Sequence, residues 1–509
     1  MLDVTPLARL YARPRLRGLA AEDPVMVQRR MLAALLARAR RTRFGLDHGF
    51  TDIRTVEEYQ ARVPLRRYED FWQDYWRASF PRLTNISWPG TVPFFAVTSG
   101  TTTGITKNIP CSREKLAADR MAGLDIIVHH LANRPRSKVM AGRSFMLGGS
   151  TDLIELSPGI WSGDLSGIVA GTIPWWARLR YFPPRRLETI TDWEAKIGRL
   201  APASLDRDIR AISGTPSWLL LFFAKLAEVK PDTAGRLADF YPDLELVVHG
   251  GVSFAPYRAA FARLLAGGHA ETREVYPASE GFIAVADRGD GDGLRLILDR
   301  GLFMEFVPVD ELDRAAPTRH WLATAEIGVN YALVLSTNAG LWSYVVGDTV
   351  RFIDLSPPRI VISGRTVYGL SAVGEHLIAE EIEAAVAAAA AAIAAEVTDF
   401  SVGALVAERD REIGHHLYIV EFAEGYPAAP HLTAFASHLD AHLAAANEDY
   451  AVHRKGDYGL GRPRVHPVAP GTFAAWMKSR RQLGGQHKVP RVITDDALFR
   501  ELRTFCGAK

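Results

Sequence analysis

Short apolar runs that alternate with helical stretches constrain the fold of this chain most strongly. Residues 244–248, 294–298 and 332–336 are short, apolar and β-capable. They are accompanied by residues 218–229 and 257–265, where apolar side chains recur at helical spacing. Strands that alternate with helices predict an α/β fold, in which β-sheets are flanked by helices.

The chain changes character after residue 374. The pattern beyond it predicts a helix over 379–396, strands over 400–406 and 416–422, a helix near 432–445, a strand over 464–468 and a last helix from Thr472. We therefore predict a large N-terminal domain over 1–366, a hinge over 367–374 and a small α+β lid domain over 375–509. At the start of the chain we predict one amphipathic helix that continues through residues 26–41.

The composition excludes several classes of protein. A net charge of +2 gives no support for a nucleic-acid or anionic-membrane partner. The longest apolar run, residues 384–395, is shorter than the ~20 residues that a membrane span requires. It therefore predicts a helix of a soluble domain. Only Cys111 and Cys506 are present, which excludes a disulfide scaffold and suits a reducing compartment. We expect a cytoplasmic monomer or weak oligomer.

A loop rich in hydroxyls and glycines follows the apolar residues 94–97. It reads Thr98-Ser99-Gly100-Thr101-Thr102-Thr103-Gly104-Ile105-Thr106-Lys107. Glycines let the backbone approach an anion, hydroxyls donate to its oxygens, and a lysine adds positive charge. The loop predicts a phosphate site, although a plain turn between strands has the same composition. It is not a Walker A loop, because Lys107 stands three residues beyond Gly104 and is followed by Asn108.

Further polar loops follow other strand-like runs, at the position where open α/β sheets bind ligands. The pair Gly250-Gly251 would expose backbone to a flat ligand such as adenine, or would form a tight turn. Tyr276 could stack on a base and Glu280 could hold Mg²⁺, although such residues are more often core or surface. Asp348 ends a strand-like run, where it could accept both hydroxyls of a ribose or belong to a hairpin turn.

Two cationic residues lie near or beyond the predicted hinge. Arg365, in the turn-like Gly364-Arg365-Thr366, could reach a ribose or phosphate, although most isolated arginines are solvated. Lys488 stands on the glycine-flanked loop Gly484-Gly485-Gln486-His487-Lys488 and would alone be taken for an exposed lysine.

Together these segments resemble the adenylate-forming enzymes, and more closely the plant auxin-responsive acyl acid–amido synthetase family with its bacterial members. The likeness extends along nearly the whole chain. Besides the segments above, it rests on Thr42-Arg43-Phe44-Gly45, Val63-Pro64-Leu65, Tyr68-Glu69, Pro216-Ser217-Trp218-Leu219, Phe303-Met304-Glu305-Phe306-Val307-Pro308, Gly374-Glu375, Pro470-Gly471-Thr472-Phe473 and Val489-Pro490-Arg491. Two departures are the threonines and isoleucine of the phosphate loop, where plant members commonly have serines and a charged residue, and a shorter chain.

The resemblance implies a two-step ligation that uses ATP and Mg²⁺. A small carboxylic acid attacks the α-phosphate, pyrophosphate leaves, and the amine of an amino acid then attacks the acyl-adenylate. The N-terminal domain would be the adenylation domain. Catalytic roles fall on Lys107, Glu280, which would hold Mg²⁺, and Lys488, which the lid would bring to the α-phosphate. Nucleotide contacts fall on Thr98, Ser99, Gly100, Thr101, Gly251, Ser253, Tyr276, Ala278, Ser279, Glu280, Asp348 and Arg365.

The acid and the acceptor are less constrained by the sequence. A predicted helix over 114–130 with Met146, Trp161, Trp175 and Trp176 suggests an aromatic-lined pocket, although such tryptophans are more often core residues. A thiol acceptor such as coenzyme A or a carrier pantetheine is the nearest alternative to an amino acid. A protein that binds nucleotide without catalysis is the alternative of another class.

Overall fold

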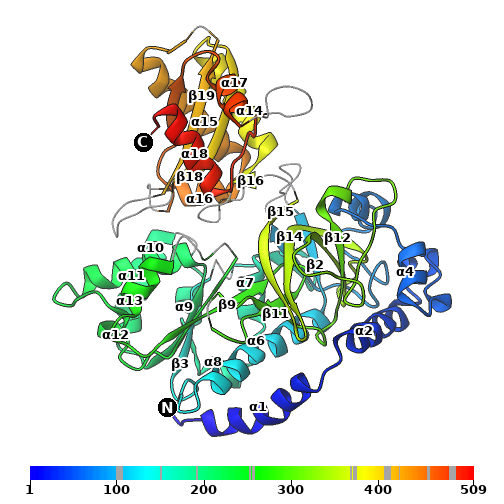
Figure 1. The fold of residues 1–509 in the computed structure, drawn as a ribbon. Helices are drawn as coiled ribbons and strands as arrows, with labels where there is room; N and C mark the ends of the chain where they lie inside the picture. The colour runs from blue at the N-terminus through cyan, green and yellow to red at the C-terminus, as the bar shows by residue number, and fades with distance from the viewer. Residues whose placement is uncertain are drawn as a thin grey trace. The chain divides into compact units, whose positions relative to one another are not determined.

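The computed structural model describes most of the chain (Figure 1). The described residues are 1–98, 107–148, 152–190, 193–251, 254, 258–289, 291–366, 369–370, 375, 377–405, 414–423, 425–455, 459–480 and 489–508. They fall into two compact units, one made of Met1–Thr98 with Lys107–Thr366 and the other of the described part of Val367–Lys509.

The chain begins with two helices, where the sequence predicted one. Helix α1 spans Thr5–Ala20 and α2 spans Pro24–Ala39. The break has a local cause, because Asp23 accepts a hydrogen bond from the Met26 backbone N–H at 3.0 Å and Pro24 starts a new first turn. Helix α1 packs along α6, to which it is tied by an Arg15–Asp125 ion pair of 2.6 Å (Figure 1).

The larger unit contains a mixed sheet of eleven described strands, in the order β12-β13-β14-β15-β11-β10-β9-β8-β7-β3-β6. From β9 to β6 neighbouring strands are parallel, and from β9 to β12 they are antiparallel. The strands are β3 (Arg143–Met146), β6 (Tyr181–Phe182), β7 (Ile209–Gly214), β8 (Leu246–Gly250), β9 (Glu271–Pro277), β10 (Phe282–Val285), β11 (Leu294–Leu296), β12 (Leu302–Pro308), β13 (Asn330–Thr337), β14 (Tyr344–Leu355) and β15 (Pro358–Arg365).

Helices cover this sheet and confirm the predicted α/β class. The shorter helices before the sheet are α3 (Arg43–Asp47), η1 (Phe50–Asp52), α4 (Val56–Arg62), α5 (Tyr68–Phe71) and η2 (Trp72–Trp76). Those among and after its strands are α6 (Arg113–Asn133), α7 (Leu165–Gly171), α8 (Trp175–Arg178), α9 (Arg185–Glu188), α10 (Trp193–Leu205), α11 (Pro216–Val229), α12 (Leu237–Phe240), α13 (Arg258–Leu265) and η4 (Val309–Glu311).

A second sheet holds both ends of the predicted phosphate loop. Its order is β2-β1-β5-β4, from β1 (Phe94–Thr98), β2 (Lys107–Cys111), β4 (Ile154–Ser157) and β5 (Ile160–Gly163). Thr98 of β1 is the register partner of Lys107 of β2. The antiparallel pair therefore brings the first and last residues of the loop side by side.

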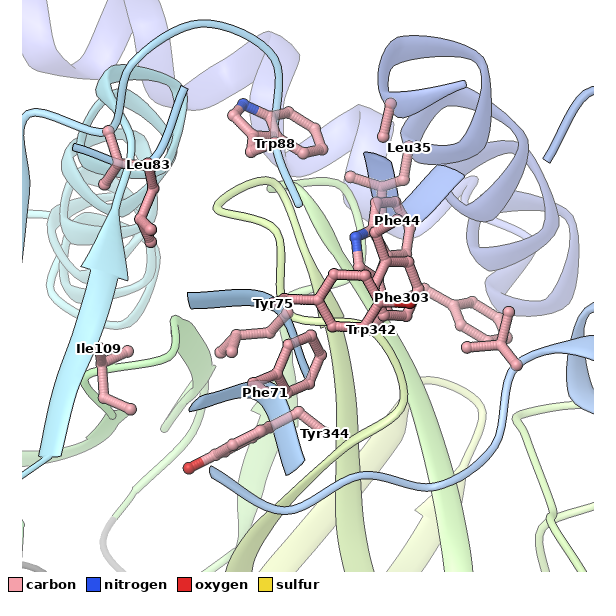
Figure 2. Packing of buried hydrophobic residues seen from close by; sticks show 14 of the residues in the cluster. Leu35, Phe44, Phe71, Tyr75, Leu83, Trp88, Ile109, Phe303, Trp342 and Tyr344 are labelled. Carbon is pink, nitrogen blue, oxygen red and sulfur yellow. The ribbon is translucent and has the colours of Figure 1, made fainter. Parts of the chain in front are cut away.

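An aromatic core lies against this sheet and the start of β14 (Figure 2). Phe44 stacks on Trp342 with ring centroids 6.1 Å apart, and Phe71 lies 6.2 Å from Tyr344. These rings are almost completely buried. The core thus holds the Tyr344 ring in place by packing against Phe71.

The smaller unit contains two sheets and five described helices. Its strands are β16 (Gly369–Leu370), β17 (Leu377–Ile378), β18 (Val397–Leu405), β19 (His415–Phe422) and β20 (Arg464–Val468), and its helices are α14 (Ala379–Ala392), α15 (Ala429–Ala446), α16 (Glu448–Arg454), α17 (Thr472–Ser479) and α18 (Asp496–Cys506). All predicted elements of this region are present, and α16 and α18 are additional. None of the helices searched along the described chain combines the length and apolarity of a membrane span.

Candidate functional site

A tight turn between β9 and β10 carries Glu280. The Ala278 N–H donates to the Gly281 carbonyl at 2.8 Å, and the Gly281 N–H donates back to the Ala278 carbonyl at 3.1 Å. A Cβ on Gly281 would lie 2.6 Å from a methyl of Leu302, so any larger residue here would require the Leu302 side chain to shift. The turn directs Glu280 inward, where it is 8% exposed.

The charges around Glu280 come from both sheets. Burial raises its pKa, as does the negative charge of Asp348, while Lys107 and Lys115 act to lower it. Tyr344 faces the same carboxylate, and burial together with Glu280 raises the pKa of that phenol well above its ordinary value. Tyr344 therefore stays protonated and can donate a hydrogen bond to Glu280.

Lys115 is a buried cation that the sequence did not single out. It lies in the first turns of α6 and is 1% exposed, with its Nζ 2.6 Å from Asp119 Oδ2. Burial acts to lower its pKa, but Cys111, Asp119 and Glu280 outweigh burial and raise it. Lys115 is therefore held in its charged form, close enough to Glu280 to interact with its carboxylate electrostatically.

Asp348 is fixed by a phenol. The Tyr276 hydroxyl of β9 donates to Asp348 Oδ2 of β14 at 2.5 Å. The prediction that a strand ends at Asp348 is wrong, because β14 continues to Leu355 and Asp348 pairs with Arg365 of β15. Gly347 has φ +100°, a conformation that favours glycine, so an irregular residue inside the strand was mistaken for its end. The expected turn at Gly364-Arg365 is likewise the end of β15.

Lys107 stands where β2 begins and is 9% exposed. Its Nζ lies 3.9 Å from Glu69 Oε1 and 5.5 Å from the centre of the Tyr68 ring. Tyr68 is itself anchored, because its hydroxyl accepts a hydrogen bond from the Asn108 N–H at 3.1 Å. The family-like pair Tyr68-Glu69 thus packs against the lysine of the phosphate loop.

The glycines after β8 have separate causes. A Cβ on Gly250 would lie 2.2 Å from the Val275 carbonyl of the neighbouring strand, whereas Gly251 has φ +87°. Gly251 therefore has the positive φ that a tight turn would need, and Gly250 permits close strand packing. Gly251 is exposed, and its proposed contact with adenine stays a prediction.

A shallow recess lies beyond the parallel strands, and its cavity volume of about 20 Å³ is close to that needed for one water molecule. It is bounded by the end of β3, by α7, by the segment from β6 through α9, and by α10. Its apolar lining consists of Met146, Ala170, Ile173, Phe182 and Pro183. Lys196 of α10 supplies a charged group to this lining and is 3% exposed.

Comparison with known proteins identifies the family of this chain. The N-terminal domain of the GH3 family matches residues 19–152, its central domain residues 295–365 and its C-terminal domain residues 380–497. The three matches occur in order and together cover more than half of the chain. The chain belongs to the GH3 family.

Two rice GH3 proteins are similar to the chain. The probable indole-3-acetic acid-amido synthetase GH3.9 of Oryza sativa subsp. japonica is 28% identical over 333 residues, which span 59% of this chain and 72% of that protein. The indole-3-acetic acid-amido synthetase GH3.8 of Oryza sativa subsp. indica is 27% identical over 332 residues, 58% of this chain and 52% of that protein. The chain thus spans about half the length of the second relative.

Two kinds of solved structure share the fold. One is the AtGH3.15 acyl acid amido synthetase in complex with 2,4-DB, with a TM-score of 0.61, 17% identity and coverage of 97% of this chain and 95% of that one. The other is 2-hydroxyisobutyryl-CoA ligase in complex with 2-HIB-AMP and CoA, with a TM-score of 0.59, 16% identity and coverage of 97% and 94%. At such identity the likeness shows the adenylate-forming fold.

The structure brings together part of the GH3 site predicted from sequence. Glu280, Asp348, Tyr276 and Lys107 interact directly or through their charges, and Thr98 borders Lys107. Ala278 and Ser279 form the turn that carries Glu280. Ser99, Gly100, Thr101, Ser253 and Lys488 lie outside the described residues, as do most of the hinge and the side chain of Arg365.

The predicted aromatic acid pocket stays a prediction, and the structure places its described residues as follows. Met146 lines the recess, but Trp175 is 81% exposed on α8 and is absent from the lining. Trp161 belongs to β5 and is also absent from that lining, and the side chain of Trp176 is outside the described residues.

Sequence reasoning missed Tyr344, Lys115 and Lys196 as site residues. Tyr344 follows Ser343 directly before the Gly347-Asp348 segment, and Lys115 precedes Asp119 by one helical turn, which are weak local signals. For Lys196 the sequence offers no signal beyond a lysine within the apolar helix α10.

Proposed function

We propose that this chain is an ATP-dependent acyl acid–amido synthetase. It adenylates a small carboxylic acid and passes the acyl group to the amine of an amino acid, releasing AMP and pyrophosphate. The observation that carries the proposal is the ordered match to all three GH3 domains around a site that joins Glu280, Asp348 and Lys107. The activities of the rice relatives support the same assignment.

The first step concentrates negative charge on the departing pyrophosphate, and the site offers groups that can offset it. Lys107 lies at the end of the phosphate loop, beside Thr98. In the proposal the hydroxyls of Thr98, Ser99 and Thr101 donate to phosphate oxygens, and Lys488 from the smaller unit acts at the α-phosphate. The first step breaks the bond between the α- and β-phosphates and forms the bond from the acid oxygen to phosphorus.

The nucleoside would lie against the other half of the site. Asp348, held by the Tyr276 hydroxyl at 2.5 Å, presents a carboxylate that can accept hydrogen bonds from ribose hydroxyls. Arg365 pairs with Asp348 across β14 and β15, so its backbone lies beside the same ribose site. Tyr276 is 5% exposed, and its edge and hydroxyl therefore carry more of the proposed contact than its face.

Glu280 fits the magnesium that accompanies the triphosphate. Mg²⁺ is commonly held by one or two carboxylates and substrate phosphates, with water completing the octahedron. The described residues contain no cluster of three histidine, cysteine or acidic side chains able to hold a metal, which suits a single carboxylate that shares the ion with phosphate oxygens. Bound there, the ion would offset charge on the leaving pyrophosphate.

The domain division remains part of the proposal. Residues 1–366 form the adenylation domain, 375–509 form the lid that carries Lys488, and 367–374 act as the hinge between the two half-reactions. Gly369 and Leu370, which form β16, are the hinge residues that the structure describes. Gly369→Pro should slow both half-reactions in rapid-quench kinetics, and unchanged rates for both would disprove the hinge.

We propose that the acid binds near the carboxyl edge of the parallel strands, where open α/β sheets bind ligands and where Met146 ends β3. The acceptor has one competing candidate. Since the coenzyme A ligase shares the fold about as closely as the amido synthetase does, a thiol acceptor is the alternative. We further propose that the enzyme works in the cytoplasm as a monomer or weak oligomer, consistent with its near-neutral charge and two free cysteines.

Acid-dependent exchange of labelled pyrophosphate into ATP tests the proposal. A panel of aromatic, indole and aliphatic acids identifies the acid, and subsequent addition of amino acids or coenzyme A identifies the acceptor. Glu280→Gln should abolish most exchange, whereas Glu245→Gln is a matched control. Glu245 is similarly buried but binds the Lys138 backbone N–H at 2.8 Å before β8 begins. Exchange that is insensitive to Glu280→Gln, or absent with every acid while ATP still binds, would refute the assignment.

A further inference from the structure

Helix α1 carries apolar side chains on its outer face as well as on its inner face. The inner face packs along α6 and includes the buried Ala12. The outer face carries Leu7, Leu10 and Tyr11, whose exposed fractions are 65%, 62% and 38%. Residues at positions i, i+3 and i+4 lie on one side of a helix, so these three side chains form a single exposed stripe.

A second group of exposed apolar side chains adjoins the start of this helix. Trp175, the first residue of α8, is 81% exposed, and Leu179, four residues later, is 67% exposed. The Arg180 guanidinium donates to the Leu2 carbonyl at 2.7 Å, which joins the segment after α8 to the residues before α1 (Figure 1). Leu2 is itself 80% exposed. We call this set the apolar patch: Leu2, Leu7, Leu10, Tyr11, Trp175 and Leu179.

Exposed cations lie on the same segments as the apolar patch. They are Arg13 and Arg17 of α1 and Arg185 and Arg186 of α9. None of these four arginines has an ion pair with another described residue. Residues 1–20 and 172–188 together contain eight arginines and two acidic residues, and one of those acids, Glu188, is buried and paired with Arg178. The net charge of +2 for the whole chain therefore conceals a local positive excess beside the apolar patch.

This combination of side chains fits an anionic membrane surface. Exposed leucines can enter the boundary between lipid headgroups and acyl chains, where tryptophan and tyrosine are also favoured. Arginines beside them attract anionic lipids. A nucleic acid would use the arginines but would gain nothing from the leucines. Lipids rearrange around protruding side chains, whereas a protein partner would need a fixed cavity and an acidic surface to match them.

We propose that the outer face of α1, together with α8, binds the surface of an anionic membrane. Helix α1 lies along the bilayer, with Leu7 and Leu10 inserted at the headgroup level and with Arg13 and Arg17 against lipid phosphates. Such binding requires no membrane-spanning helix. It does not depend on the proposed ligase activity, and it is compatible with a cytoplasmic enzyme because the cytoplasmic leaflet carries anionic lipids.

Sedimentation of the full-length protein with vesicles tests the inference. One set of vesicles is pure phosphatidylcholine, and the other contains about 30% phosphatidylglycerol. The wild-type protein should bind the anionic vesicles about 100-fold more tightly than the neutral vesicles in ~0.1 M salt. Most of this preference should disappear in ~1 M salt, where the Debye length falls to about 3 Å.

Two leucine substitutions test the apolar contribution. Leu7→Ser combined with Leu10→Ser removes both inserted side chains and should weaken binding to anionic vesicles about 10- to 100-fold. The matched control is Leu46→Ser combined with Ile327→Ser, which changes side chains that are 67% and 59% exposed elsewhere in the larger unit. The control should bind like the wild type.

Two arginine substitutions test the charge. Arg13→Glu combined with Arg17→Glu should reduce the preference for anionic vesicles at least about 30-fold. Arg77→Glu combined with Arg351→Glu makes the same change in net charge at two other exposed arginines, and should keep most of the preference. Thermal unfolding of each variant within a few degrees of the wild type shows that lost binding does not come from misfolding.

Fluorescence provides a test that requires contact with lipid. Vesicles with brominated acyl chains should quench part of the tryptophan emission of the wild-type protein, because Trp175 is exposed on the proposed surface. Trp175→Phe should lose this quenching. Trp161→Phe changes a partly buried tryptophan of β5 and should retain it.

Several results would overturn the inference. They are wild-type protein that binds neither kind of vesicle or both equally, leucine or arginine variants that bind like the wild type, and quenching that survives Trp175→Phe. A concentration-dependent dimer in the absence of lipid that the leucine variant abolishes, without vesicle binding by the wild type, would assign the patch to contacts between copies of the chain instead. Absent pyrophosphate exchange would refute the proposed function and leave the vesicle result unaffected.

Discussion

Replacement of Glu280 by glutamine should raise the stability of the enzyme while removing most of its activity. Burial raises the pKa of this carboxyl, which means that desolvation outweighs the attraction of Lys107 and Lys115. Glutamine keeps the shape of the side chain without the buried charge. Removing an incompletely compensated buried charge should change stability on the order of 1 kcal/mol, here as a gain in the free energy of unfolding. For a unit of more than 300 residues that gain corresponds to a rise of about 1–2 °C in melting temperature.

The stability gain has a defined pH dependence. A carboxyl whose pKa is raised in the folded state costs stability when it is ionised, and costs none when it is protonated in both states. The advantage of glutamine should therefore be full at pH 7–8, should decline as pH falls through the raised pKa of Glu280, and should vanish below the ordinary pKa of glutamate. Urea unfolding of both proteins between pH 4 and 8 measures this difference.

The activity should move in the opposite direction. Loss of a group that stabilises transition-state charge typically lowers turnover about 10²–10³-fold. In Glu280→Gln we expect such a loss of acid-dependent pyrophosphate exchange, with a higher Mg²⁺ concentration needed for half-maximal rate. A stability loss above ~2 kcal/mol with a parallel loss of ATP binding would show that Glu280 is a structural residue. That result would refute both the sign of the charge argument and the magnesium role.

Three further substitutions test other contacts. Tyr276→Phe removes the hydroxyl that donates to Asp348 at 2.5 Å. It should raise the KM for ATP about 5-fold with little change in the KM for the acid. An unchanged KM for ATP would show that Asp348 does not take part in ribose binding. His416→Leu removes the 2.7 Å hydrogen bond between His416 Nε2 and Glu375 Oε1. It should destabilise the smaller unit by ~1–3 kcal/mol in urea unfolding, and unchanged stability would show that this hydrogen bond does not stabilise the unit. Gly250→Ala would place a Cβ 2.2 Å from the Val275 carbonyl and should lower stability by ~2–3 kcal/mol, and a wild-type melting temperature would disprove that clash.

Much of the fold could be predicted from local patterns, because strands and helices in this chain differ in period and punctuation. The strand over 464–468 coincides with β20, and the helix near 432–445 lies within α15. The errors fall where one residue decides the geometry. Asp23 caps α2 and divides the expected first helix, and Gly347 bends β14 without ending it. A glycine before an aspartate has the same composition in a turn and in an irregular strand, so the sequence alone could not separate them.

Part of the candidate site could also be predicted from local sequence patterns, and part could not. Gly251 after β8 and Glu280 after β9 could be predicted to lie at one edge, since these neighbouring parallel strands end there. Asp348, which lies inside β14, could not. Lys115, Tyr344 and Lys196 could not, because their relevance depends on contacts across the fold. Tyr344 packs on Phe71 of the aromatic core and faces the Glu280 carboxylate. Both residues are far from Tyr344 in the sequence.

The balance of charge in the described site bears on how a triphosphate could bind there. Lys107 lies within 3.9 Å of Glu69, Lys115 is paired with Asp119, and both lysines also face Glu280. Asp348 adds a further carboxylate, so the described groups do not present a surplus of positive charge to a polyanion. Additional cations must then come from outside this set, and the proposal supplies them as Mg²⁺ on Glu280 and Lys488 from the smaller unit. This proposal gives a reason for a buried carboxylate at Glu280 that lowers stability. The Mg²⁺ ion that Glu280 would bind carries two positive charges, more than the single negative charge of the carboxylate.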